Sequence, residues 1–223
     1  MARYAPKRVA RYGRNSHLAQ LAKQGVKVLP VLREGAFMKE IVTESANGHG
    51  LLVAGTHGVR SLRQEILGSD MLRLARTAAV PSLVVQVYSP RQVKMDRILM
   101  PVAGHGDVAP LLNAVVALAK ACRSHVEVYQ QLVEGQSTSN QLLHNKVKMM
   151  ERLAHEGIKH SETNEPVEKF YEGFVQRTIR YARNHGVDCI AIMAHASGDH
   201  RNADKEKQQL LTNELGVPVL CAV

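Results

Sequence analysis

The sequence predicts an α/β protein of two tandem, doubly wound parallel-sheet units, the first of which lacks its opening strand, helix and strand. Two observations in the 223 residues support this prediction. Short runs rich in Val, Ile and Leu alternate with segments of helical spacing, as in parallel sheets covered by helices. The last elements of the second half recur in the same order in the first half, which indicates an internal duplication.

The second unit, residues 94–223, contains the complete pattern. Most of the expected strands are short runs rich in apolar residues, and the helices repeat apolar residues at three- and four-residue intervals, as Leu142, Met150 and Leu153 illustrate. The expected strands lie at 97–102, 125–130, within 158–170, at 187–194 and at 217–223, with helices at 108–122, 141–155, 174–184 and around 205–215. Five strands with four crossover helices make a small doubly wound domain.

The first unit, residues 1–93, repeats only the end of this pattern. Its expected elements are a short helix near 17–24, strands at 26–31, 51–55 and 82–87, and helices at 37–47 and about 69–76. In this repeat Val80-Pro81 aligns with Val217-Pro218, before the closing strands 82–87 and 217–223. The opening strand, helix and strand of the second unit have no counterpart here. We expect residues outside this sequence or another chain to complete the unit, or the unit to stay open.

Composition and charge narrow the function classes. The chain is 45% hydrophobic and 22% charged, and it has no apolar run long enough to cross a bilayer, so we expect a cytoplasmic protein with no membrane partner. Its three cysteines lie far apart, which argues against structural disulfides. The net charge is +9 in residues 1–93 and zero in residues 94–223, which fits a polyanion partner, a nucleotide pocket or a solvated basic face. With 3 Phe, 6 Tyr and no Trp, a base-stacking nucleic-acid surface is not expected.

One loop in the first unit has a pattern suited to phosphate. Glycines allow the backbone to approach a ligand closely, and a Gly-Ser pair at a helix N-terminus directs N–H groups and a hydroxyl toward an anion. The alternative is that the glycines shape a tight turn and the serine caps the helix. The candidate nucleotide-binding residues are Gly55, Thr56, His57, Gly58, Gly68 and Ser69.

This loop, Gly-x2-Gly-x9-Gly-Ser between LLVAGTHG and VPSLVVQV, resembles the ATP-binding motif of the universal stress protein family. The resemblance extends over nearly the whole chain and implies the adenine nucleotide alpha hydrolase-like fold, ATP as ligand, a cytoplasmic location, and a homodimer or an intramolecular pseudo-dimer. It also implies that the closing strands 82–87 and 217–223 lie side by side across a pseudo-two-fold axis. In the family's sheet order the missing opening strands lie between 26–31 and 51–55, which are therefore left without a bridge. The second unit departs from the motif. Ala103 stands where ATP-binding members have an Asp, and Met193 and Ala196 stand where the first unit has Gly55 and Gly58. We therefore expect the second unit not to bind ATP in the family manner.

The resemblance implies a universal stress protein-like, non-enzymatic regulatory protein of the stress response that binds ATP through the first-unit loop. Two alternatives remain: a structural tandem module that has lost nucleotide binding, and a weak ATP-hydrolysing enzyme. Hydrolysis needs a carboxylate that binds a metal ion and a group that positions the attacking water, and the sequence identifies no residue for either role.

Two other sites are less favoured. Gly104-x-Gly106-x-x-Ala109, with Glu127 beyond it, fits a dinucleotide fingerprint, but Asp107 would lie beside the pyrophosphate and fits better as a helix N-cap. His195, Asp199, His200 and Asp204 are residue types that bind zinc or manganese, although 11 histidines make a chance cluster the better explanation. Neither a metal site nor a catalytic site is expected.

Overall fold

The computed structural model describes residues 24–29, 31–56, 68–86, 94–133, 137–167, 173–195 and 203–223. The chain forms two compact units, Met1–Ala36 and Phe37–Val223. Within Met1–Ala36, residues 24–29 and 31–36 contain no helix or strand, so the strand predicted at 26–31 is wrong. A strand needs a neighbour that exchanges backbone hydrogen bonds with it, and no described strand pairs with these residues. Residues 17–23 of the predicted first helix lie outside the described residues.

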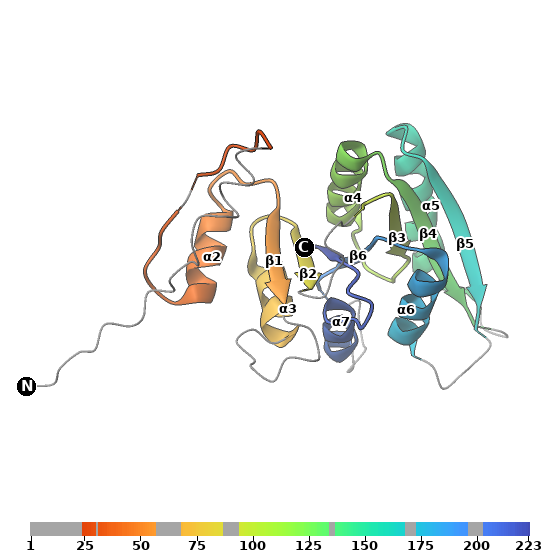
Figure 1. Cartoon of the computed structure of the whole chain (residues 1–223). Helices are drawn as coiled ribbons and strands as arrows, with labels where there is room; N and C mark the ends of the chain where they lie inside the picture. The colour runs from red at the N-terminus through yellow and green to blue at the C-terminus, as the bar shows by residue number, and fades with distance from the viewer. Residues whose placement is uncertain are drawn as a thin grey trace, which may run out of the picture. The chain divides into compact units, whose positions relative to one another are not determined.

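The unit Phe37–Val223 is built on one seven-stranded sheet with the order β1-β2-β7-β6-β3-β4-β5 (Figure 1). The strands are β1 (Leu52–Thr56), β2 (Ser82–Gln86), β3 (Arg97–Pro101), β4 (His125–Leu132), β5 (His160–Pro166), β6 (Cys189–Met193) and β7 (Val219–Ala222). All neighbouring strands are parallel except β2 and β7, which run antiparallel. The predicted α/β class is confirmed, and all five strands expected in residues 94–223 are present.

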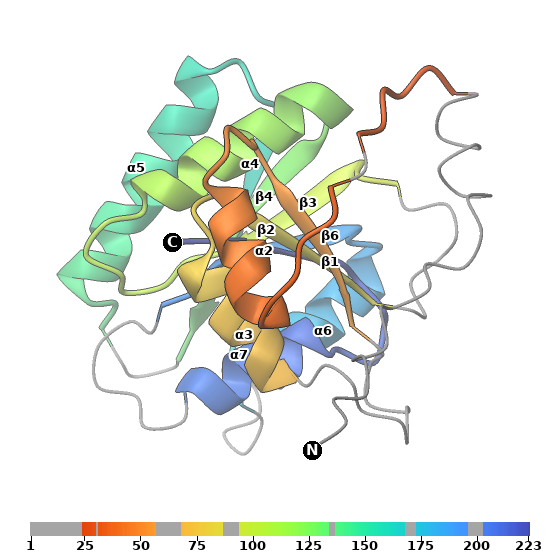
Figure 2. The same cartoon turned by 90° about the vertical axis from the view of Figure 1, so that its left-hand side faces the viewer.

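Helices cover both faces of this sheet. They are α2 (Phe37–Ser45), α3 (Gly68–Thr77), α4 (Ala109–Cys122), α5 (Asn140–His155), α6 (Phe174–His185) and α7 (Ala203–Leu211). α4 and α5 lie over one face of the sheet, and α3, α6 and α7 lie over the other, as Figures 1 and 2 show. α4 and α5 supply residues to one buried apolar cluster, and α3, α6 and α7 supply residues to a second. No helix in the described parts of the chain is both long and apolar enough to cross a membrane.

Local sequence explains where the helices begin and end. The hydroxyl of Ser139 accepts a hydrogen bond from the backbone N–H of Leu142 at 3.3 Å and so caps α5. Gly186 ends α6 with a left-handed φ of 61°, which glycine adopts without steric cost. Asp107 is not the N-cap of α4, a position that Val108 occupies, but its Oδ1 accepts from the N–H of Ala109 at 2.9 Å. The predicted cap is thus displaced by one residue.

The two halves of the sheet repeat each other. β1, α3 and β2 form the same strand-helix-strand unit as β6, α7 and β7, and the antiparallel seam pairs Leu83 with Leu220. The expectation that the two closing strands lie side by side is confirmed. At the far end of the sheet, β1 pairs with β2 alone among the described strands, and Val53 is 60% exposed there.

Candidate functional site

A cavity of about 640 Å³ lies at the carboxyl ends of β3, β4 and β6. Pro101, Gln130 and Met193 contribute to its lining from these three strands. β3 lies between β4 and β6, and the chain winds outward from β3 through β4 to β5 before it crosses to β6 and β7. In doubly wound sheets such a switch point separates the adjoining loops and opens a crevice where ligands bind.

The two sides of the cavity differ in polarity. Val108 and Leu111 of the α4 region and Leu142 and Met149 of α5 form an apolar side. The opposite side is lined by Arg177 of α6 and by Glu206 and Lys207 of α7, together with apolar residues. A ligand that fits both sides has an apolar body and an anionic group.

Lys207 is held at the end of β6. Its Nζ donates hydrogen bonds to the carbonyl oxygens of Met193 at 2.7 Å and of His195 at 2.6 Å. The carbonyl oxygen between them, that of Ala194, accepts from Nε of Arg76 at 3.0 Å. Burial lowers the pKa of Lys207 to about 8. Two cationic side chains thus hold three successive carbonyl groups at the edge of the cavity.

His105 forms part of the lining beside Lys207. Its exposed fraction is 8%, and its carbonyl oxygen accepts from Nδ2 of Asn145 at 2.8 Å, which fixes the loop after β3. Burial, helped by the nearby charges of Lys207 and His195, lowers the pKa of His105 to about 4. The imidazole is therefore neutral at neutral pH.

This lowered pKa predicts acid sensitivity. Between pH 6.5 and 4 the unfolded chain takes up a proton at His105 that the folded chain does not, so the free energy of unfolding falls as the pH falls. We expect this group to cost about 2 to 3 kcal/mol by pH 4. Urea unfolding of the wild type and of His105→Gln, measured from pH 7 to 4, should show the variant losing less stability. Parallel pH profiles would contradict the assignment.

Gln130 provides a buried acceptor at the cavity. Gln130 is only 3% exposed, and its Nε2 donates a hydrogen bond to the hydroxyl of Thr138 at 3.3 Å. No donor among the described residues reaches its Oε1. Buried polar atoms are usually paired, so a donor group on a bound ligand is a suitable partner.

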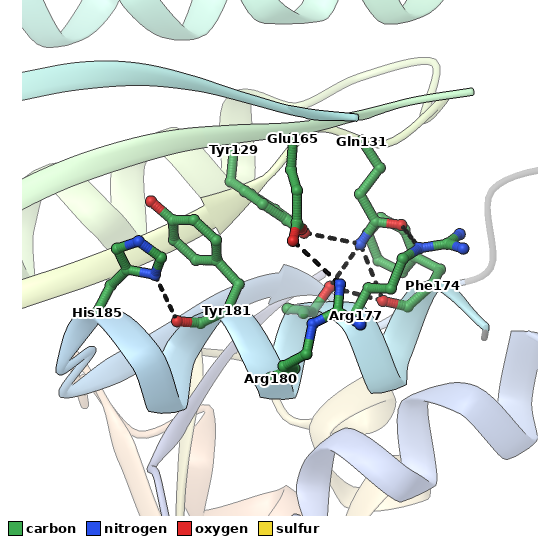
Figure 3. A network of polar contacts seen from close by, with 9 residues as sticks. Tyr129, Gln131, Glu165, Phe174, Arg177, Arg180, Tyr181 and His185 are labelled. Atoms are coloured by element: carbon green, nitrogen blue, oxygen red, sulfur yellow. Dashed lines mark hydrogen bonds and ion pairs between the residues drawn. The ribbon is translucent and has the colours of Figure 1, made fainter. Parts of the chain in front are cut away.

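A polar network fixes Arg177 on the α6 side (Figure 3). Nε of Arg177 donates to Oε1 of Gln131 at 2.7 Å. Nε2 of Gln131 in turn donates to the carbonyl oxygen of Phe174 at 3.0 Å and to the hydroxyl of Tyr129 at 3.1 Å. Because Gln131 is held at both ends of its amide, it restricts the orientation of the guanidinium beside the cavity.

The structure describes four of the six residues predicted to bind nucleotide. Gly55 and Thr56 end β1, and Gly68 and Ser69 begin α3, while His57 and Gly58 lie outside the described residues. A Cβ on Gly68 would come within 3.2 Å of Cγ2 of Thr212, so close packing against the end of α7 explains this glycine. None of the four described residues lines the cavity. Nucleotide binding at this loop stays a prediction.

The dinucleotide interpretation is wrong about its acidic residue. Glu127 lies inside β4, 5% exposed, and accepts hydrogen bonds from the hydroxyls of Tyr181 and Thr163. It is therefore unavailable to a ribose. Of the candidate metal ligands, Asp204 pairs with Arg76, His195 is exposed, and Asp199 and His200 lie outside the described residues. No group of three or more His, Cys, Asp or Glu within the described ranges is placed to hold a metal ion.

Sequence reasoning missed Gln130, Arg177 and Lys207, because none belongs to a recognisable motif. The one signal was positional, since Gln130 follows the apolar part of a predicted strand and so falls at the carboxyl edge of the sheet. Arg177 and Lys207 lie within polar helices, where their sequence neighbourhood does not distinguish them from solvated residues.

The fold and the cavity define a doubly wound α/β domain with a ligand crevice at its switch point, and this fold is that of the universal stress proteins. A universal stress protein from Archaeoglobus fulgidus DSM 4304 is 16% identical, with a TM-score of 0.65 over 92% of this chain and 73% of that one. A candidate universal stress protein from Pseudomonas aeruginosa UCBPP-PA14 is 14% identical, with a TM-score of 0.60 over 97% and 79%. A functionally unknown protein from Pseudomonas aeruginosa PAO1 is 16% identical, with a TM-score of 0.59 over 97% and 79%. No protein-family model matches the chain, and no curated protein matches it.

Proposed function

We propose that the chain is a universal stress protein-like, non-enzymatic binding protein that holds an adenine nucleotide in the cavity at the carboxyl ends of β3, β4 and β6. The observation that carries the proposal is the position of this cavity at the switch point of the sheet, between an apolar side and a side bearing Arg177 and Lys207. Its volume of about 640 Å³ lies within the range of about 300 to 1,000 Å³ typical of small-molecule sites.

A regulatory role fits this cavity better than hydrolysis does. Among the described lining residues Glu206 is the single carboxylate, whereas phosphoryl transfer uses carboxylates to hold a metal ion and a group that orients the attacking water. The resemblance of the sequence to the family supports a role in the stress response in the cytoplasm. The antiparallel β2–β7 seam supports an intramolecular pseudo-dimer as the arrangement of the two halves.

Gly104 and Gly106 offer a matched pair of variants that tests the cavity. A Cβ at either residue meets no atom within 4 Å, and neither has a positive φ, so both accept a larger side chain without backbone strain. Gly104 lines the cavity and Gly106 does not. We expect Gly104→Leu to weaken ATP binding at least about tenfold in isothermal titration by filling the cavity, and Gly106→Leu to leave it unchanged. Equal affinities for the two variants would contradict the proposed site.

The first-unit loop makes a competing prediction that the same titration resolves. If that loop binds the nucleotide, Gly58→Val abolishes binding by steric exclusion, whereas Gly198→Val has little effect. The proposed cavity predicts that Gly58→Val retains wild-type affinity. Loss of binding in Gly58→Val with full binding in Gly104→Leu would move the site to the loop.

A further inference from the structure

One N–H of the Lys207 ammonium group makes no hydrogen bond to the described residues. An ammonium group carries three N–H bonds, and two of those on Lys207 point to the carbonyl oxygens of Met193 and His195. No third acceptor among the described residues takes the remaining one, although the side chain lines the cavity. The two carbonyl bonds hold the charged nitrogen in place, so little side-chain entropy is lost when it meets an anion.

The internal duplication shows what Lys207 replaces. When Val80-Pro81 is aligned with Val217-Pro218, Lys205 and Glu206 take the places of Gly68 and Ser69. The small residues that would expose backbone N–H groups to an anion are therefore lost in the second half. Lys207, one residue further along α7, instead brings a full positive charge to the same end of the sheet.

We infer that Lys207 is the anion-binding residue of the cavity, and that it makes the site select phosphorylated ligands over the corresponding nucleosides in a pH-dependent manner. The inference rests on the proposed function, because it assigns the anionic end of the ligand in that same cavity. The apolar residues of α4 and α5 then face the base, and Gln130 faces a donor on it.

The groups around Lys207 leave this end of the cavity positive. Asp204 lies one turn earlier on α7, but the guanidinium of Arg76 on α3 binds both of its carboxylate oxygens. Glu206 on α7 and Arg177 on α6 line the cavity with opposite charges, and His105 and Cys221 are uncharged at neutral pH. Besides these groups, His195 faces Lys207 from the end of β6 through its carbonyl oxygen.

Protonation of Lys207 sets the pH dependence. Burial lowers its pKa to about 8, so the ammonium form is present below this pH and the neutral amine above it. A bound phosphate stabilises the ammonium form, and by linkage binding above pH 8 takes up a proton. A phosphate monoester is already fully ionised there, since its second pKa is about 6, so this uptake belongs to the protein.

Isothermal titration of the full chain with ATP, AMP and adenosine tests the inference. At pH 7.5 we expect AMP and ATP to bind at least about tenfold more tightly than adenosine, and Lys207→Met to reduce this preference to within about twofold. Lys207→Arg keeps the charge and should retain the preference. Lys205→Met removes an exposed lysine from the same helix and serves as the matched control.

Proton uptake distinguishes a ligand contact from a structural role. Titration of AMP at pH 8.5 to 9 in buffers of different ionisation enthalpy should show uptake of up to one proton by the wild type and none by Lys207→Arg, because arginine does not titrate there. Equal affinity for AMP and adenosine, or uptake that persists in Lys207→Arg, would overturn the inference and leave the proposed function standing. If no nucleotide binds but pyrophosphate binds in a Lys207-dependent manner, the proposed function fails and the anion site stands. If neither binds, both are wrong.

Discussion

Replacing Glu127 with alanine lowers the free energy of unfolding by about 2 to 4 kcal/mol, because the change leaves buried donors without an acceptor. The Glu127 carboxylate accepts from the hydroxyls of Tyr181 and Thr163, the latter at 2.6 Å, and from Arg97 at 3.2 Å. Burial alone would raise the pKa of Glu127, but these hydrogen bonds and the charge of Arg97 lower it below its usual range. The stabilisation is therefore complete above the ordinary pKa of about 4.5 and is lost as the pH falls through the lowered value.

Urea unfolding followed by circular dichroism measures this loss. Glu127→Gln keeps an acceptor oxygen for the two hydroxyls, so we expect it to lose about half as much stability as the alanine variant at neutral pH. Glu151→Ala, which removes an exposed carboxylate from α5, is the control and should change stability by less than about 0.5 kcal/mol. An alanine variant at Glu127 as stable as the wild type would show that the network is energetically neutral.

Replacing Leu74 with alanine destabilises the whole unit Phe37–Val223 by about 2 to 4 kcal/mol. Leu74 lies on α3 in the first half of the chain and is 1% exposed. It belongs to the same buried cluster as Leu211 of α7 and Ile190 of β6, which lie in the second half. A cavity left on α3 should therefore destabilise strands that lie more than a hundred residues away in the sequence.

Hydrogen exchange identifies where this loss is felt. We expect β6 and β7 to lose protection in Leu74→Ala together with α3, in one cooperative transition. Val53→Ala, in the exposed part of β1, should shift stability by less than about 0.5 kcal/mol. If only residues before 94 lose protection, the two sequence-defined units fold independently.

Much of the fold could be predicted because its local signals agree with its packing. The run RILMPV becomes β3, whose residues Ile98, Leu99 and Met100 are fully buried between two helical layers, so hydrophobicity alone identified it. β5 was harder to place within 158–170, because HSETNEP is an edge strand with half-exposed side chains and carries little apolar signal. The strand predicted at 26–31 was wrong because an apolar run does not make a strand without a partner.

The candidate site was less accessible to sequence reasoning for a physical reason. A glycine-rich loop can be recognised in a sequence, because ligand binding by the backbone needs small residues at fixed spacing. A site formed by side chains such as Gln130, Arg177 and Lys207 depends on which strand ends the topology brings together, and no spacing along the chain encodes that. Gly68 shows that a motif residue can also have a structural explanation, because its lack of a side chain is equally explained by its contact with Thr212.

The antiparallel β2–β7 seam has a consequence for synthesis on the ribosome. β2 pairs with β1, which is made before it, and with β7, which is made last among the described strands. Until β7 has been translated, the edge of β2 that later pairs with β7 has no partner among the described strands, and two paired strands alone are marginally stable in water. The nascent first half therefore exposes a strand edge between the synthesis of β2 and that of β7, which is a period when aggregation competes with folding and when a chaperone has surface to protect.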